Sequence, residues 1–132
     1  MTLIYAPKKC FLLVALLLLA SCQQELPAST DNLQKIFDTR DFTVTFIVGE
    51  KEHFMGFRQD YMTYKHNGNT IRETISYEQA LAVNNFIQQQ LVQYDNKAVP
   101  NATIVESPQY KVVIKTAGDN DNFQQLLTKL EL

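Results

Sequence analysis

The residue capable of the most specific chemistry is Cys22, whose thiol follows two small residues, Ala20 and Ser21. An apolar run of about ten residues precedes it and starts at Phe11, directly after Lys8-Lys9. A basic start, an apolar stretch and small residues before a cleavage point are the anatomy of an export signal, whereas a bilayer-spanning helix needs about 20 apolar residues. The pattern therefore predicts that the segment before Cys22 is removed.

Leu19-Ala20-Ser21-Cys22 resembles the lipobox of bacterial lipoprotein precursors, and the resemblance covers the first 22 residues. It implies that diacylglycerol is attached to the Cys22 thiol, that the peptide bond before this residue is cut, and that acyl chains such as palmitate hold the mature chain on a membrane. Gln23 stands where the enterobacterial inner-membrane retention rule has Asp, which favours the outer membrane in a Gram-negative cell. The alternatives are an uncleaved apolar helix and a plain secretory signal cut near Ala20.

Composition limits what the mature chain can be. Residues 22–132 number 111, a usual size for a single domain. Cys10 leaves with the signal and Cys22 carries lipid, so no thiol remains for a disulfide or a metal site. In the mature part, 10 Lys and Arg residues stand against 14 Asp and Glu residues without a basic run. This balance lacks the electrostatic footprint of a nucleic-acid-binding protein.

The sequence divides into three parts. Residues 1–21 are predicted to be the signal peptide. Residues 22–39 are predicted to hold the lipid anchor and a tether, because segment 23–32 is polar, contains a proline and lacks hydrophobic periodicity. A short helix is expected over residues 32–39. Residues 40–132 are predicted to form a single α+β domain.

Several segments have the period-2 pattern of strands. Residues 42–48 alternate as a strand with one buried face does. Asn67-Gly68 tolerates the positive φ angles of a two-residue turn, so residues 60–66 and 69–75 are predicted to pair as a hairpin. This turn length places the following residues opposite each other: Tyr64 and Ile71, Met62 and Glu73, and Asp60 and Ile75. The inner face of the hairpin is expected to carry Tyr64, Met62, Ile71 and Ile75.

Ser76 and Gln79 form a capping-box pattern, which predicts a helix over residues 77–94. Beyond this helix the periodicity predicts strands over residues 103–106 and 110–115 and a C-terminal helix over residues 120–131. The expected fold class is α+β, with an antiparallel sheet of four to five strands packed against the long helix 77–94 and the C-terminal helix 120–131.

Metal and cofactor sites find little support in the sequence. His53 and His66 are interpreted as two solvated loop histidines, because zinc needs three or four N or S ligands and the cysteines are spent. Asp119-Asn120-Asp121-Asn122 is similar to a calcium loop, but Phe123 takes a ligand position and the required glycine is missing, so we interpret it as a helix cap. We therefore expect no metal and no cofactor. Carboxylate pairs stay open, because sequence does not show which carboxylates approach each other.

The segment from Phe54 to Tyr64 holds too many large apolar side chains for one buried face. Strict alternation places them in two groups, with Phe54, Met62 and Tyr64 on one face and Met55, Phe57 and Tyr61 on the other. Three explanations stay open. Gly56 marks a bulge that turns Phe57 inward, or a helix covers the outer aromatics, or Phe57 and Tyr61 form an exposed partner-binding patch.

The expected function is that of a non-enzymatic binding module, held by the lipid on Cys22 at the cell envelope, that contacts a protein or an envelope partner. The first alternative is an inhibitor or immunity protein directed against a secreted toxin or hydrolase. The second is a hydrolase that uses carboxylates. No serine or threonine stands in a nucleophile motif, which argues against acyl-transfer chemistry.

Overall fold

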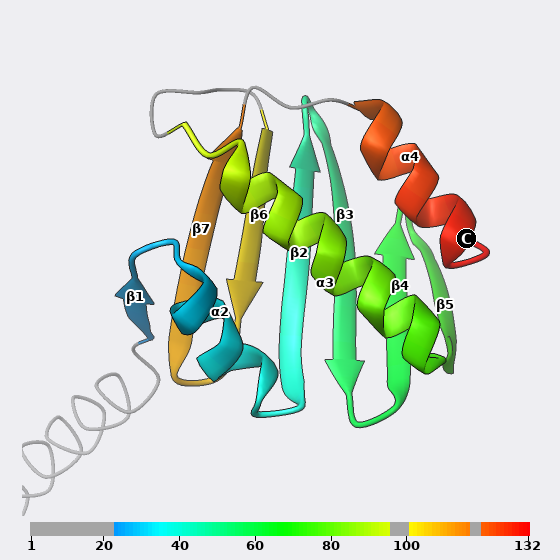
Figure 1. Cartoon of the computed structure of the whole chain (residues 1–132). Coiled ribbons are helices and arrows are strands. Elements are labelled where there is room, and N and C mark those ends of the chain that lie inside the picture. Colours follow the sequence, from blue (N-terminus) through cyan, green and yellow to red (C-terminus); the bar gives the residue numbers. More distant parts are fainter. Residues whose placement is uncertain (1–22, 96–100, 117–119) are drawn as a thin grey trace, which may run out of the picture.

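The computed structural model describes residues 23–95, 101–116 and 120–132 (Figure 1). The elements in these ranges are β1 (Gln24–Leu26), α2 (Thr30–Phe37), β2 (Asp41–Val48), β3 (Lys51–Arg58), β4 (Tyr61–His66), β5 (Asn69–Thr74), α3 (Tyr77–Val92), β6 (Asn101–Glu106), β7 (Tyr110–Thr116) and α4 (Asn120–Lys129). None of these helices has the length and apolar character that crossing a bilayer requires.

The strands form one seven-stranded sheet in the order β1-β7-β6-β2-β3-β4-β5. All neighbouring pairs are antiparallel except β1 and β7, which run parallel. The predicted α+β class is confirmed. The predicted strand number of four to five is wrong, because the sheet gains β1 at one edge and an additional hairpin strand in its middle.

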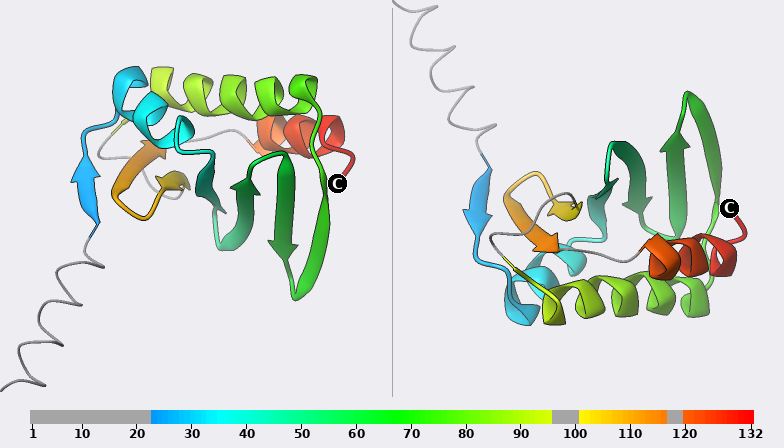
Figure 2. Two further views of the ribbon diagram at one scale, coloured as in Figure 1. Left: turned by 90° about the horizontal axis from the view of Figure 1, so that it is seen from below. Right: turned by 90° about the horizontal axis from the view of Figure 1, so that it is seen from above.

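The molecule has two layers. The two views of Figure 2 show α2, α3 and α4 on the same face of the twisted sheet, with α3 crossing it diagonally as seen in Figure 1. The opposite face carries no helix in the described part of the chain. The core lies between the layers, where the largest fully buried side chains are Phe46, Phe123, Leu33, Ile36, Met55, Met62, Ile87, Ile114 and Leu130.

The surplus of aromatics between residues 54 and 64 is explained by a hairpin that sequence reasoning missed. Gln59 and Asp60 form a two-residue turn between β3 and β4, and Phe57 pairs with Met62 across it. A two-residue turn reverses the parity of the inward positions, so Met55 and Phe57 share the buried face with Met62 and Tyr64. The bulge considered at Gly56 is wrong, because Gly56 pairs regularly with Thr43 and Thr63.

The predicted tether is part of the fold. Within segment 23–32, Gln24 to Leu26 form β1 in register with Tyr110 to Val112 of β7. Ser29 then caps α2 by accepting a hydrogen bond of 3.1 Å from the Asn32 backbone N–H. The flexible tether is therefore a wrong prediction. The short polar segment is held by backbone pairing with a strand that is distant in sequence.

The Asn67-Gly68 hairpin is confirmed in type and register. Asn67 and Gly68 have φ angles of 51° and 77°, which are the two left-handed positions of this turn. Tyr64 lies opposite Ile71 and Met62 opposite Glu73. Tyr64 and Met62 are buried as expected, but Ile71 is 41% exposed because β5 is the edge strand of the sheet.

The predicted helices are present with small changes in their ends. Ser76 and Gln79 form both hydrogen bonds of the capping box, and α3 ends at Val92 rather than near residue 94. Phe86 of α3 is 8% exposed and packs on Phe46 and Phe123. The C-terminal helix spans Asn120–Lys129, whereas the caps expected from Asp119 lie outside the described residues.

Candidate functional site

Two turns meet at one end of the sheet, the lower end in Figure 1. The α2–β2 turn contains Arg40 and the β3–β4 turn contains Gln59, and the Gln59 backbone N–H donates a hydrogen bond of 2.9 Å to the Arg40 carbonyl. Both residues adopt left-handed backbone conformations, with φ angles of 55° and 57°. For a residue with a Cβ this conformation costs about 1 kcal/mol. Such strained positions often occur at functional sites.

The two turns and the start of α3 enclose an open polar hollow of about 990 Å³. Its lining residues are Thr39, Arg40, Asp41, Arg58, Gln59, Asp60, Ile75, Ser76, Tyr77 and Ala80. Among the described residues the ion pair is Lys111–Glu106, at 3.8 Å, so neither Arg40 nor Arg58 has a carboxylate within salt-bridge distance. Both arginines line the hollow together with Asp41 and Asp60.

An apolar pocket of about 370 Å³ adjoins the hollow and shares Tyr77 and Ala80 with it. Its wall includes three phenylalanines in contact: the Phe42 ring centroid lies 5.1 Å from that of Phe57 and 5.1 Å from that of Phe37. We call the pocket and the hollow together the α2–α3 groove, since α2 supplies Phe37 and α3 supplies the opposite wall. The apolar interior suits a large apolar side chain, and the adjoining hollow offers two arginines and two aspartates, Asp41 and Asp60, to polar groups beside it.

The rim of the groove is apolar and faces solvent. Tyr77 is 77% exposed and Leu81 is 39% exposed, and both line the pocket from the first turns of α3. A partner that covers these two exposed side chains removes apolar surface from water, which favours binding. The rim thus adds apolar area to whatever surface the groove binds.

The two residues predicted as a partner-binding patch lie on opposite faces of the sheet. Phe57 is 7% exposed and forms part of the groove wall. Tyr61 is 47% exposed on the helix-free face, where the Arg72 guanidinium lies 5.9 Å from its ring centroid. The pair therefore cannot act as one patch. Cys22, the predicted lipidation site, lies outside the described residues.

The interpretation of His53 and His66 as loop residues is wrong, because they lie in β3 and β4, and His53 is also buried, whereas His66 is partly exposed. The two rings stack with centroids 3.8 Å apart, and His53 is 5% exposed beneath α4, where the Phe123 ring lies 4.6 Å away. A hydrogen bond of 2.7 Å joins His53 Nδ1 to the Tyr64 hydroxyl. Burial, the neighbouring His66 and Lys51 lower the pKa of His53 from 6.5 to about 4. His53 is therefore neutral at physiological pH.

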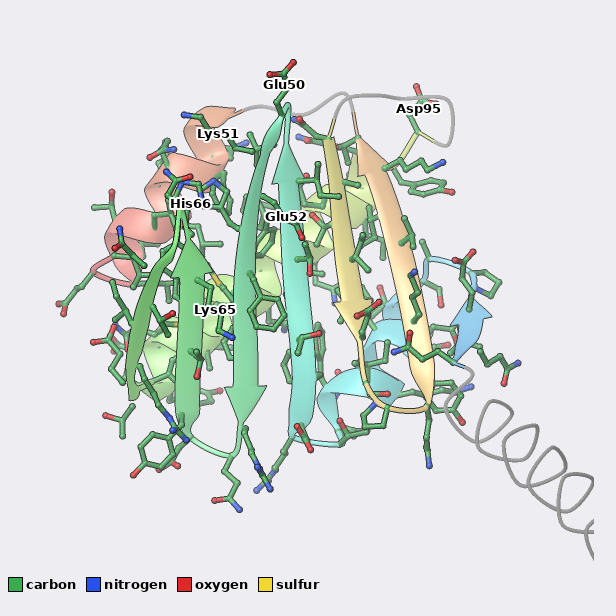
Figure 3. All side chains as sticks on the ribbon, turned by 180° about the vertical axis from the view of Figure 1, so that it is seen from behind. Glu50, Lys51, Glu52, Lys65, His66 and Asp95 are labelled. Carbon is green, nitrogen blue, oxygen red and sulfur yellow. The ribbon has the colours of Figure 1, made fainter. Side chains whose placement is uncertain are left out.

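His66 contacts the backbone of the neighbouring strand at the other end of the sheet from the groove. Its Nδ1 lies 3.0 Å from the Glu52 carbonyl oxygen, and Figure 3 shows both residues on the upper half of the sheet. The described part of the chain brings no three His, Cys, Asp or Glu side chains together as a metal site. The calcium-like motif 119–122 begins outside the described residues.

Sequence reasoning missed the α2–α3 groove because its parts are separated along the chain. Arg40 and Gln59 stand in turns without glycine, and Tyr77 and Leu81 were assigned to no surface. The available signal was the exposed tyrosine at the start of a helix, one residue after a capping serine. Comparisons with protein-family models, with curated proteins and with solved structures found no match.

Proposed function

We propose that this chain is the precursor of a bacterial lipoprotein whose mature domain is a non-enzymatic binding module of the cell envelope. The lipobox-like sequence ending at Cys22 supports the lipid anchor, and Gln23 favours the outer membrane if the cell is Gram-negative. The domain binds a protein partner through the α2–α3 groove. The alternative partner is a secreted toxin or hydrolase, which would make the domain an inhibitor or immunity protein.

The observation that supports binding most strongly is the combination of chemistries in the groove. Phe37, Phe42 and Phe57 provide an apolar wall. Arg40 and Arg58 line the adjoining hollow beside Asp41 and Asp60, and neither arginine forms an ion pair with another described residue. Arginine binds carboxylates in a planar, bidentate geometry, which gives direction to an otherwise apolar contact. We therefore propose that the partner inserts a large apolar side chain and presents an acidic residue or a terminal carboxylate beside it.

Site-specific photo-crosslinking in cells tests this function. A benzophenone amino acid replaces Leu81 at the groove rim, and a control protein carries it at Thr70, which is exposed on β5. The expected result is a discrete adduct from position 81 and none from position 70, because only position 81 is next to the groove. The adduct should disappear when Arg40→Glu and Arg58→Glu are combined.

A second pair of substitutions controls for the effect of charge reversal alone. Lys65→Glu with Arg72→Glu makes the same change of charge on the helix-free face and should leave the adduct from position 81 intact. No adduct from position 81, or an adduct that survives reversal of both groove arginines, would contradict groove binding. Circular dichroism of each variant confirms that loss of the adduct does not reflect unfolding.

A carboxylate-based hydrolase is the second candidate, because Asp41 and Asp60 both line the hollow. Acid/base hydrolysis needs two carboxylates that approach a shared substrate. Under this alternative, Asp60→Asn abolishes turnover of an envelope polymer or lipid ester by the purified domain. Under the binding proposal, Asp60→Asn changes no turnover and leaves the adduct from position 81 in place.

A further inference from the structure

The chain enters its fold almost immediately after the proposed anchor. The Gln23 side chain donates a hydrogen bond of 2.7 Å from Nε2 to the Ser107 carbonyl, and the Gln24 backbone N–H donates one of 3.0 Å to the Gln109 carbonyl. Both acceptors lie in the β6–β7 turn. Gln23 is therefore the single residue between Cys22 and the sheet, and the Cα atoms of residues 22 and 24 lie at most about 7 Å apart.

The register shows which end of the sheet receives the anchor. Gln24 pairs with Tyr110, the first residue of β7, so β1 and β7 start at the same end. The antiparallel register places the α2–β2 turn and the β3–β4 turn at this end too. Figure 1 shows all of them at the lower end of the sheet. Residues of the α2–β2 and β3–β4 turns line the polar hollow of the α2–α3 groove.

We infer that no flexible linker separates the mature domain from the bilayer. The end of the sheet that carries the β6–β7 and β3–β4 turns then lies at the level of the lipid headgroups. The inference rests on the proposed lipid anchor at Cys22. The partner of this end of the domain is the membrane surface. The inference also favours groove partners that reach the membrane surface, because the hollow lies at the same end of the sheet as the attachment point.

Charge does not hold this end on the membrane. Arg40 and Arg58 at the lower end are outnumbered by Asp38, Asp41 and Asp60, all of which are exposed. The hold is covalent, through the short connection to Cys22. We therefore expect the domain to keep the same orientation on vesicles of phosphatidylcholine alone and at high salt, where attraction between exposed charges is screened.

The experiment measures the distance of each end of the domain from the membrane. The lipidated protein is reconstituted in phosphatidylcholine vesicles that contain a headgroup-attached quencher. A dye is placed on Gln109→Cys in the β6–β7 turn or on Glu50→Cys in the β2–β3 turn, two exposed positions at opposite ends of the sheet. Since the mature sequence contains no thiol besides the modified Cys22, each variant is labelled at one place.

The dye at position 109 should be quenched severalfold more than the dye at position 50, because eight-residue β2 separates the ends by about 26 Å. A variant with a 12-residue Gly/Ser spacer, inserted after Gln23 and ending in glutamine, controls for the dye sites. Its spacer has a root-mean-square length of about 20 Å, so the difference in quenching between the two positions should largely vanish.

Equal quenching at both positions, or no effect of the spacer, would overturn the inference while leaving the proposed anchor standing. Palmitate labelling of the same samples separates the two claims. Its absence would overturn the lipid anchor and the inference with it, whereas labelled protein with equal quenching would contradict only the close attachment.

Discussion

At the scale of single residues, the least expected contact is the stack of His53 on His66. The register of β3 and β4 brings them together, because Phe54 pairs with Lys65 and the next pair outward is His53 with His66. Their separation in sequence gave no hint of this, since the missed Gln59-Asp60 turn is what folds one strand back on the other. Burial of His53 makes stability depend on pH, because the folded state favours the uncharged form of this side chain.

The free energy of unfolding should fall as the pH drops from about 6.5 to about 4. The folded-state pKa of His53 is about 4 and its ordinary value is 6.5, so in this window the unfolded chain binds a proton that the folded chain does not. The contribution of neutral His53 to the free energy of unfolding is fully present above pH 6.5, and the loss of this contribution on acidification is on the order of 3 kcal/mol. Urea unfolding at pH 7.5, 5.5 and 4.5 measures it. His53→Phe should have a lower free energy of unfolding than the parent protein at pH 7.5, but this free energy should fall less between pH 7.5 and pH 4.5. If it falls as steeply as in the parent protein, groups other than His53 cause the pH dependence.

Phe57 and Tyr61 should respond differently to the same substitution. Phe57→Ser removes a buried ring that contacts Phe42, so we expect a loss of about 3 kcal/mol or more in the free energy of unfolding. Tyr61→Ser removes an exposed ring and should cost less than about 1 kcal/mol. Chemical denaturation compares the two variants. Similar losses would mean that Tyr61 is buried, contrary to its place on the helix-free face.

At the scale of elements, the predictable hairpin was the one whose turn is encoded locally. Asn67-Gly68 places two residues that accept left-handed conformations side by side, which fixes both the turn and the register of β4 and β5. The β3–β4 turn uses Gln59 in the same conformation, stabilised by its hydrogen bond to the Arg40 carbonyl. That hydrogen bond joins residues from different turns, so no local pattern predicts it. The capping box of α3 was predictable for the opposite reason, since Ser76 and Gln79 satisfy each other.

Gly68→Val should lower the free energy of unfolding by on the order of 1 to 3 kcal/mol, because a β-branched residue is forced to a φ of 77°. Gly56→Ala is the matched control. Gly56 lies inside β3 without a positive φ, and an added Cβ would meet the Phe54 ring at an ordinary 3.5 Å. Thermal unfolding of both variants measures the contrast. Equal stability of Gly68→Val and the parent protein would contradict the left-handed turn.

At the scale of the whole molecule, the sequence predicts the α+β class and most of its elements, but not the extent of the domain. The boundary expected near residue 40 fails because Leu33 and Ile36 of α2 are fully buried and β1 extends the sheet. Pairing of β1 with β7 joins segments more than 80 residues apart, and three-residue β1 carries no strand signal of its own. The α2–α3 groove was unpredictable for the same reason, since it exists only where α2, α3 and two turns meet.

Limited proteolysis should therefore spare residues 24–40, although residues 23–32 were expected to be a flexible tether. Backbone pairing and burial of α2 protect this segment from a protease that needs an extended, accessible chain. Leu33→Ala should cost about 3 kcal/mol in the free energy of unfolding, as expected for a fully buried leucine, and should expose the segment to cleavage. Lys35→Ala, an exposed change in the same helix, serves as the control. Rapid cleavage of the parent protein within residues 24–40 would contradict the place of β1 and α2 in the fold.

The measurement that tests the central claim most directly is the intact mass of the protein extracted from membranes, read together with its N-terminal peptide. A lipid-anchored binding module predicts a chain that starts at Cys22 and carries a diacylglycerol thioether on this residue. It also predicts that Cys22→Ser is neither lipidated nor cut before residue 22, because attachment requires the thiolate sulfur. A mature chain that starts elsewhere, retains residues 1–21 or has an unmodified Cys22 would contradict the anchor and the orientation inferred from it.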